Sequence, residues 1–445
     1  MEVLHAGAMA VSDPFLPAAP HLMGPDAGSA LACAVNAHGG RLIDAHPVQV
    51  QHRPGHEVVV RYDATVAWAG RTAQRETLLA AATTSGTPAG TVPVAAGDLE
   101  AGVWRYPFDP VLPGLASAVT PGALDELLAG HLAPHPDLAV VAYRPLRRAV
   151  VQACDGRRTA YVKVVLPSEA RSIADHHERL RHAGLPVPVV LGLDADRGLL
   201  VLDALPGRTL RDRLLDQRTD WPTTPAYADL LDQLRSVPLP SGATAAMTAL
   251  EAAPSHARAL TAIVPSEARR LDRVLANVHH DAGQPSHLTT IHGDLYEAQL
   301  LVDGAGRITG LLDLDDVSAG DAMDDAATLL AHLHILQPAT RLHREQLARY
   351  RRLIRADLVG RHVPGADRAA LDRRTAAVLL GLATGPFRAQ RHRWVDEVRR
   401  RLAMADALSA SREKTLRRTS STRHPQVGQR SRGVAPAAPR NVPLT

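Results

Sequence analysis

The segment formed by residues 291–321, IHGDLYEAQLLVDGAGRITGLLDLDDVSAGD, places two short apolar runs around Gly-Ala-Gly and surrounds them with carboxylates. Burying charge without partners is expensive, so this segment can fold only where something neutralises the carboxylates. The runs QLLVD and RITGLLD predict a tight β-hairpin. Such a hairpin brings Gln299, at the start of its first strand, beside Asp313, at the end of its second. Asp294 lies five residues before Gln299 and is expected at the same edge.

The side chains expected at this edge are two carboxylates and one amide, which are hard oxygen donors of the kind that Mg²⁺ prefers. Mg²⁺ held by one or two carboxylates together with substrate phosphates is the usual arrangement for phosphoryl transfer. The pattern therefore predicts a magnesium and phosphate site built from Asp294, Gln299 and Asp313. Asp303 is different, because its position beside Gly304 is typical of a turn.

Lysine is almost absent from the chain: Lys163 and Lys414 are the only two lysines among 50 Lys and Arg residues. Lysine carries a compact point charge on a slim stem, whereas arginine carries a wide planar fork. Lys163 therefore marks a position where arginine was not acceptable. It lies in the predicted strand AYVKVV, ahead of a predicted helix, where a lysine can bind the phosphates of a nucleotide.

Composition indicates a globular protein, with 45% apolar and 22% charged residues among 445. A chain of this length should divide into two or three subdomains. No run of apolar residues is long enough to span a membrane. The N-terminal segment also lacks the basic residues with which a secretory signal begins. With Cys33 and Cys154 as the only cysteines, a disulfide framework is excluded. We therefore expect a cytoplasmic protein with no membrane partner.

Positive charge is concentrated in residues 411–445, where eight Lys or Arg residues face one Glu. Because the whole chain has a formal charge of +4, subtracting the tail's +7 leaves residues 1–410 at about −3. The tail is rich in Ser, Pro and Arg, which predicts disorder. It could bind RNA through its charge, but a solvated tail is the favoured interpretation, so no specific nucleic-acid partner is expected.

The order of predicted elements divides the chain into five parts. We expect a flexible N-terminus over residues 1–30, a cap-like α/β subdomain over 31–136, a small β-rich lobe over 137–205, a mostly helical lobe over 206–410 and a disordered tail over 411–445. An internal echo is also present, because HRPGHEVVVRY (52–62) aligns with YRPLRRAVVQA (143–153). This similarity suggests a duplicated β-hairpin.

The motifs HGDLYEAQLL and LLDLDDVSAGDAMDDAA resemble those of the aminoglycoside phosphotransferase and choline kinase-like family. YVKVV, AGLPVPVVL and LVLDALPGRTL add to the likeness, which covers about residues 138–408. The resemblance implies an α+β, bilobal protein-kinase-like fold with a small β-rich N-lobe and a mostly helical C-lobe. It also implies an ATP- and Mg²⁺-dependent kinase that phosphorylates a hydroxyl of a small-molecule acceptor.

By motif position, the resemblance makes Asp294 the catalytic base and Asp313 the main Mg²⁺ ligand. Gln299 stands where the family usually has a metal-binding Asn. One of the neighbouring carboxylates assists the metal, and Asp315 is the candidate. Lys163 would hold the phosphates of ATP.

The resemblance also implies supporting residues. His292 would shape the catalytic loop, and Asp321 and Asp325 would brace it through hydrogen bonds. The residues expected to meet the adenine through their backbone are Leu202, Asp203 and Leu205.

Several positions depart from the family pattern. Gln299 is one methylene longer than Asn, Ala322 and Ala326 replace a Pro and a Leu, and the phosphate-covering loop RPLRRAV has no glycine. Two acids on the following helix, Asp175 and Glu178, compete as the partner of Lys163. These departures keep open an alternative, a nucleotide-binding pseudokinase with a regulatory or scaffold role.

The acceptor is expected to be a sugar or an aminoglycoside-like compound bound in the helical lobe, near GPFRAQRHRW (385–394). A pocket for a polycationic aminoglycoside should be acidic, whereas this segment is rich in Arg, which favours a neutral or anionic acceptor. Family members that phosphorylate maltose also carry an additional N-terminal subdomain, and by this analogy the chain is expected to resemble that type.

Overall fold

The computed structural model describes most of the chain outside its two ends. The described residues are 13, 15–24, 26–96, 99–216, 221–280, 288–361, 368–389 and 391–411. The predicted basic tail therefore lies outside them, apart from Ser411. None of the described helices is both long and apolar enough to cross a membrane.

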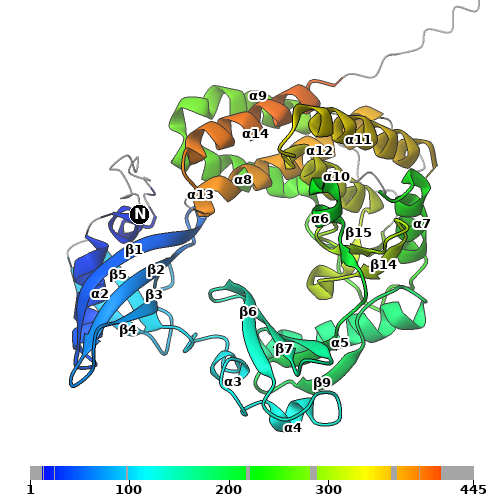
Figure 1. Ribbon diagram of the computed structural model, residues 1–445. Helices are drawn as coiled ribbons and strands as arrows, with labels where there is room; N and C mark the ends of the chain where they lie inside the picture. Colours follow the sequence, from blue (N-terminus) through cyan, green and yellow to red (C-terminus); the bar gives the residue numbers. More distant parts are fainter. Residues whose placement is uncertain are drawn as a thin grey trace, which may run out of the picture. The chain divides into compact units, whose positions relative to one another are not determined.

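The N-terminal subdomain is a five-stranded antiparallel sheet covered on one face by two helices (Figure 1). The strands follow the order β1-β2-β3-β5-β4, and Leu22 and Leu31 of the helices are fully buried against them. These elements are α1 (Ala18–Met23), α2 (Ala27–Asn36), β1 (Gly40–Arg53), β2 (Glu57–Trp68), β3 (Gln74–Thr83), β4 (Val92–Ala96) and β5 (Leu99–Arg105).

This arrangement corrects the expectation that residues 1–30 form a flexible N-terminus. Helix α1 begins at Ala18 and α2 at Ala27, so a large part of that segment is ordered. The Ala- and Pro-rich composition suggested fraying, but Leu16 and Leu22 are buried in the core beneath the sheet.

The N-lobe is a second antiparallel sheet with strand order β6-β7-β8-β10-β9. Alternate residues of β10 face opposite sides: Leu199 and Val201 pack in a cluster with Leu115 and Leu128, while Leu200 packs with Ile173. The elements are α3 (Leu115–Ala118), α4 (Asp125–Leu128), β6 (Asp137–Arg144), β7 (Arg148–Cys154), β8 (Thr159–Val164), α5 (Pro167–His182), β9 (Val190–Asp194) and β10 (Leu199–Asp203). Since α3 and α4 pack on this sheet, we propose that the N-terminal subdomain ends near Arg105 rather than at residue 136.

The C-lobe is mostly helical and contains short strands. Its helices are α6 (Leu210–Leu215), α7 (Thr224–Arg235), α8 (Ala249–Ile263), α9 (Ala268–Val278), α10 (Ala322–Ile335), α11 (Arg341–Arg361), α12 (Arg368–Ala383), α13 (Gly385–Arg388) and α14 (Trp394–Ser409). Its strands are β11 (Arg208–Thr209), β12 (Thr289–Ile291), β13 (Leu300–Val302), β14 (Ile308–Leu311) and β15 (Ser318–Gly320). A β-rich N-lobe and a mostly helical C-lobe confirm the expected α+β, bilobal arrangement.

The hairpin predicted for residues 299–313 is confirmed. Strand β13 pairs antiparallel with β14, with Leu300 opposite Leu311, and Asp303 forms the turn by accepting hydrogen bonds from the backbone of Ala305 and Arg307 at 2.9 Å each. A ladder between β12 and β15 joins the two ends of the surrounding segment. The hairpin is therefore held at its base as well as at its turn.

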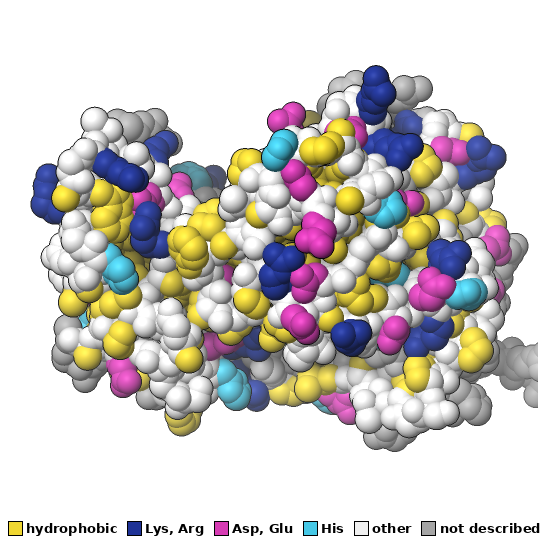
Figure 2. All heavy atoms as spheres, turned by 90° about the horizontal axis from the view of Figure 1, so that it is seen from below, with side chains coloured by type: hydrophobic (Ala, Val, Ile, Leu, Met, Phe, Trp, Pro, Cys, Tyr) yellow, Lys and Arg dark blue, Asp and Glu magenta, His cyan; other side chains and the backbone are white. Residues whose placement is uncertain are grey.

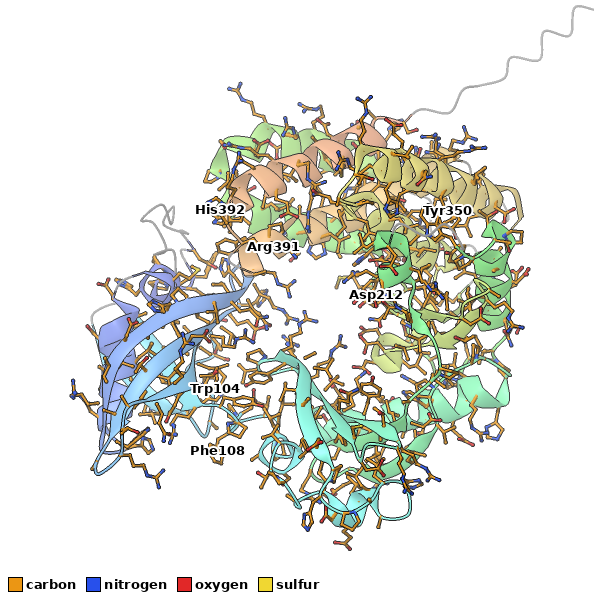
Figure 3. The ribbon with its side chains drawn as sticks, viewed as in Figure 1. Trp104, Phe108, Asp212, Tyr350, Arg391 and His392 are labelled. Atoms are coloured by element: carbon orange, nitrogen blue, oxygen red, sulfur yellow. The ribbon has the colours of Figure 1, made fainter. Side chains whose placement is uncertain are left out.

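Both copies of the internal echo also form hairpins. Arg53 pairs with Glu57 across the tip of β1–β2, and Arg144 pairs with Arg148 across the tip of β6–β7. The end of β1 contacts α13, and the segment that follows α13 carries the labelled Arg391 (Figure 3). The N-terminal subdomain thus reaches the C-lobe through its first hairpin.

One face of the molecule carries basic and acidic side chains interspersed with apolar ones (Figure 2).

Candidate active site

The hairpin brings Gln299 and Asp313 together, as the sequence pattern requires. The Nε2 of Gln299 donates a hydrogen bond to Oδ2 of Asp313 at 3.1 Å, and the backbone N–H of Leu312 donates to the carbonyl of Gln299 at 2.8 Å. Asp313 follows the end of β14 with φ of 60°, a left-handed conformation that an Asp tolerates better than a bulky residue. This turn of the backbone places its carboxylate beside the amide.

Lys163 joins the two lobes at this point. It lies in β8 with only 4% of its surface exposed, and its Nζ donates to Oδ1 of Asp313 at 2.6 Å and also to Asp315. Burial alone would raise the pKa of Asp313, but the charges of Lys163 and Arg148 outweigh it and hold that pKa below its usual value. The one lysine of the described residues thus neutralises the predicted metal ligands.

Arg148 is a site residue that the sequence did not single out. Its Nη2 donates to Oδ2 of Asp313 at 2.8 Å and its Nη1 to Oδ2 of Asp315 at 2.9 Å, so one guanidinium spans both carboxylates. It is the first residue of β7, after the glycine-free loop. The only available signal was a run of arginines where the family pattern places glycines.

Neither acid proposed as the partner of Lys163 contacts it among the described residues. Glu178 is exposed and pairs with Arg181 at 2.9 Å, and the structure shows no contact between Lys163 and Asp175. Helix α5 instead approaches the hairpin through His176, whose Nδ1 is 2.9 Å from the carbonyl oxygen of Leu314. Lys163 instead takes its carboxylate partners, Asp313 and Asp315, from the residues that follow β14.

His292 ties the catalytic loop to the hairpin. Its Nε2 is 2.8 Å from the carbonyl oxygen of Leu312, and its Nδ1 is 3.3 Å from the backbone nitrogen of Asp294. A carbonyl can only accept and a backbone N–H can only donate, so these contacts assign the neutral tautomer with its proton on Nε2. The ring therefore fixes the position of Asp294 relative to the end of β14.

Asp325 and Asp321 support the same loop. Asp325 is 2% exposed and accepts hydrogen bonds from the backbone N–H groups of His292 at 2.7 Å and Gly293 at 3.0 Å. Asp321 begins α10 by accepting from the N–H of Met323 at 2.9 Å, and it pairs with Arg374 at 2.7 Å. Both carboxylates are thus satisfied within the protein and position the loop.

The predicted adenine-contact residues lie where β10 leaves the N-lobe. Leu202 is 8% exposed and pairs with Tyr161 of β8. The carboxylate of Asp203 accepts from the backbone N–H of Val189 at 2.6 Å, which fastens the end of β10 to the chain entering β9. Leu205 follows in the connection to the C-lobe, beside Gly310 of β14. Their contact with a nucleotide base stays a prediction.

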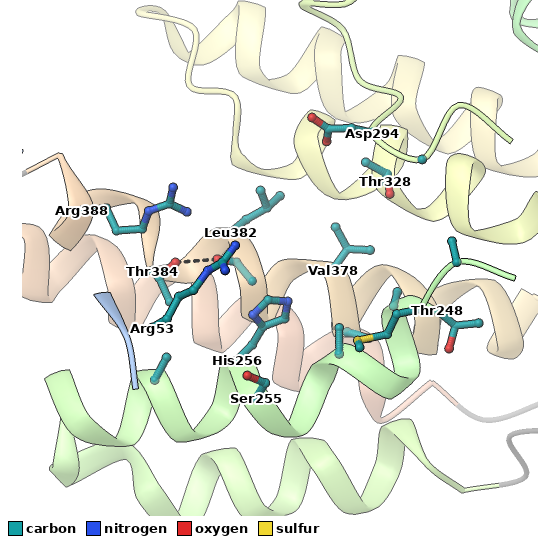
Figure 4. A pocket seen from close by; sticks show the side chains of 18 of the residues that line it. Arg53, Thr248, Ser255, His256, Asp294, Thr328, Val378, Leu382, Thr384 and Arg388 are labelled. Atoms are coloured by element: carbon teal, nitrogen blue, oxygen red, sulfur yellow. Dashed lines mark hydrogen bonds between the residues drawn. The ribbon is translucent and has the colours of Figure 1, made fainter. Parts of the chain in front are cut away.

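Asp294 faces a cavity of about 700 Å³ lined by the loop that carries it, by helices α8, α10, α12 and α13, and by the two hairpin tips. Figure 4 shows part of this lining, with Asp294 labelled. Desolvation by burial is the main cause that raises the pKa of Asp294 to about 6. The negative charge of Asp313 adds to this shift. No described residue forms an ion pair with the Asp294 carboxylate, which leaves it available to a ligand in the cavity.

The donor set fits Mg²⁺ bound together with phosphates. Asp313, Asp315 and Gln299 offer two carboxylates and an amide at one edge, with Lys163 beside them. Among the described residues no group of three or more His, Cys, Asp or Glu side chains could hold a metal alone. Mg²⁺ seldom uses an all-protein cage and is commonly held by one or two carboxylates plus substrate phosphates.

Comparison with known proteins gives a family match over the segment that contains this site. The sequence model of a family described as "Phosphotransferase enzyme family" matches residues 147–362. No curated protein sequence matches the chain.

Similar solved structures include three phosphotransferases. A putative aminoglycoside phosphotransferase from Ralstonia eutropha has a TM-score of 0.46 and 17% identity, covering 64% of this chain and 94% of that chain. A macrolide 2'-phosphotransferase type I has a TM-score of 0.43 and 20% identity, with 65% and 96% covered. A thermostable mutant of aminoglycoside phosphotransferase APH(4)-Ia, in a ternary complex with AMP-PNP and hygromycin B, has a TM-score of 0.43 and 18% identity, with 64% and 97% covered. Residues 147–362, which include Lys163, Gln299 and Asp313, are thus similar in sequence to the phosphotransferase enzyme family.

Proposed function

We propose that this protein is an ATP- and Mg²⁺-dependent phosphotransferase that acts on a hydroxyl of a small-molecule acceptor. The observation that carries the proposal is the convergence of Lys163 from the N-lobe with Asp313 and Asp315 from the C-lobe, at 2.6 Å for Lys163 and Asp313. This cluster adjoins a cavity into which Asp294 points. Charge neutralisation beside an unpaired carboxylate is what phosphoryl transfer requires, since catalysis there rests on positioning and electrostatics.

Each residue has a distinct role in this proposal. Asp313, Asp315 and Gln299 would hold Mg²⁺, which neutralises charge on the phosphates when it is bound. Lys163 and Arg148 would bind phosphate oxygens of ATP. Asp313 and Asp315 hold both cations through hydrogen bonds, so the two positive charges lie beside the proposed Mg²⁺ ligands.

Asp294 would act as the base. The acceptor oxygen forms a bond to the γ-phosphorus as the bond from that phosphorus to the β–γ bridging oxygen breaks. The hydroxyl proton passes to Asp294, and ADP leaves with the bridging oxygen. A pKa of about 6 suits this role, because a base works best when its pKa lies near the working pH.

The alternative is a nucleotide-binding pseudokinase with a regulatory or scaffold role. The glycine-free tip between β6 and β7 favours it, because Pro145 offers no backbone N–H and the neighbouring side chains are bulky. The two unpaired cysteines, Cys33 and Cys154, are consistent with a reducing cytoplasm for either function.

The deciding experiment measures ADP release by the purified full-length protein with a panel of sugars, sugar derivatives, amino alcohols and aminoglycosides. Acceptor-dependent release should fall by about 10²–10⁴-fold in Asp294→Asn, the range expected when a general base is removed. Asp303→Asn, which changes a turn carboxylate of the same hairpin, should keep the activity. If ATP binds but no acceptor raises ADP release, the protein is a nucleotide-binding pseudokinase and the kinase proposal is wrong.

A further inference from the structure

The cavity beside Asp294 has an unusual charge distribution for a pocket in front of a catalytic carboxylate. Its lining includes four arginines, which we call the arginine cluster, and three carboxylates. The arginine cluster consists of Arg53, Arg144, Arg147 and Arg388, and the carboxylates are Glu57, Asp294 and Asp324.

Two of the three carboxylates are already neutralised. Asp324 pairs with Arg374, which lies outside the cavity lining, at 2.8 Å. Glu57 pairs with Arg147 at 2.9 Å and with Arg53 at 3.4 Å. Only Asp294 remains without a cationic partner, and it is the group proposed to receive the acceptor hydroxyl.

Arg144 and Arg388 are left without a carboxylate at ion-pair distance among the described residues. Burial lowers the pKa of Arg144, and the positive charge of Arg388 lowers it further. The pKa of Arg388 is lowered by burial and then by the charge of Arg53. Cations held together in a partly dehydrated cavity repel one another, and an anion that enters removes this repulsion.

The N-terminal subdomain contributes directly to this cluster. Arg53 ends β1, at the tip that contacts α13, and its side chain lies with that of Arg388 on one side of the cavity, opposite Asp294 (Figure 4). The tip is fixed by Asp13, whose carboxylate accepts from the backbone N–H of Gly55 at 2.9 Å and lies 2.8 Å from Nε2 of His52. The two hairpins of the sequence echo thus deliver Arg53 and Arg144 to the same cavity.

We propose that the arginine cluster binds an anionic group of the acceptor, a phosphate or carboxylate on a sugar or polyol whose hydroxyl lies at Asp294. The N-terminal subdomain completes this site through Arg53. Arginine forks match the oxygens of phosphates and carboxylates, and such charge-assisted hydrogen bonds are the strong ones. The inference rests on the proposed phosphotransferase function and assigns its substrate class.

The kinetic test compares acceptors that differ only in charge. Glucose, glucosamine, gluconate and a glucose phosphate are each given to the full-length protein with Mg²⁺ and ATP, and ADP release is followed. The anionic members should have the highest kcat/KM, and Arg388→Ala should raise their KM about 10–100-fold, as expected for loss of a hydrogen bond to a charged group. The control Arg341→Ala removes an arginine whose side chain is 88% exposed and does not line the cavity.

A binding test separates this inference from catalysis. With the nucleotide site filled by Mg²⁺ and AMP-PNP, calorimetry measures the affinity of the protein for the glucose phosphate and for gluconate. Arg388→Ala and Arg53→Ala should each weaken binding about tenfold or more, and Arg341→Ala should leave it unchanged. The two anions distinguish a phosphate site from a carboxylate site.

The outcomes separate the proposed anionic site from the proposed kinase activity. A preference for glucose or glucosamine, or anion binding that survives both cavity substitutions, overturns the anionic site while the kinase stands. Anion binding that depends on Arg388 and Arg53, without any ADP release, supports the anionic site but rules out the proposed kinase activity. Absence of anion binding overturns the proposal whatever the turnover.

Discussion

Replacing Asp294 with Asn should make the protein more stable while it removes activity. The carboxylate is largely buried and has no ion-pair partner among the described residues, so the folded state resists its ionisation. Its pKa is raised from 3.8 to about 6, mainly by burial. Asparagine has nearly the same shape but carries no charge, so the substitution removes this cost without leaving a cavity.

The magnitude follows from the pKa values of the two states. A shift from 3.8 to about 6, at 1.36 kcal/mol per pKa unit, corresponds to about 3 kcal/mol. Because the folded pKa is higher than the unfolded one, the folded state binds the proton more tightly, and stability falls as pH rises through that window. The gain on substitution should therefore be about 3 kcal/mol near pH 8 and about 1 kcal/mol near pH 4.5.

Urea unfolding of both proteins, followed by tryptophan fluorescence near those two pH values, measures this difference. Trp221 packs beside Tyr350 in the C-lobe and reports on the lobe that contains the loop. Asp303→Asn is the matched control: hydrogen bonds from Arg307 hold the pKa of Asp303 below its usual value, so its loss brings no gain at neutral pH. Equal or lower stability of Asp294→Asn near pH 8, or a gain independent of pH, would refute the argument.

Four other outcomes are expected. The pH profile of kcat/KM should fall about tenfold per pH unit below pH 6, because the Asp294 base is then protonated. Asp325→Ala should lower the free energy of unfolding by about 2–3 kcal/mol in denaturant titrations, since two buried N–H groups lose their acceptor. Lys163→Arg should raise the KM for ATP as Lys163→Ala does, because the site is only 4% exposed and has no room for a guanidinium. Gln299→Ala should raise the Mg²⁺ concentration needed for half-maximal activity, whereas Gln299→Asn should change it much less.

The positions of the hairpin residues in the site could be predicted from the sequence, because they depend on residues close together in the chain. The alternation of apolar residues around a glycine turn determines the register that puts Gln299 beside Asp313, and the structure has that register. Lys163 was identified by the scarcity of lysine, and it reaches the same edge from β8. These positions follow from hairpin geometry and side-chain choice alone.

The long-range part could not be read in the same way. Arg148 lies 165 residues before Asp313, and their contact depends on how the N-lobe packs above the hairpin. The acids of α5 were proposed from spacing, but the rotation of that helix directs Glu178 to solvent. Arg53 reaches the cavity only because the tip of the first hairpin contacts α13.

The excess of negative charge in residues 291–321 is resolved by separate partners for almost every carboxylate. Asp316 is exposed to water, and the buried or half-buried ones are neutralised by cations or by backbone amides. The pairs are Glu297 with Arg211, Asp303 with Arg307, Asp313 and Asp315 with Lys163 and Arg148, and Asp321 with Arg374. Asp294 is the carboxylate of this segment that is largely buried and still unpaired among the described residues. A protein retains such a costly group where a ligand will use it. The same reasoning applies across the cavity to Arg144 and Arg388, so in the proposed acceptor site the unpaired charges of both signs would bind the two ends of the ligand.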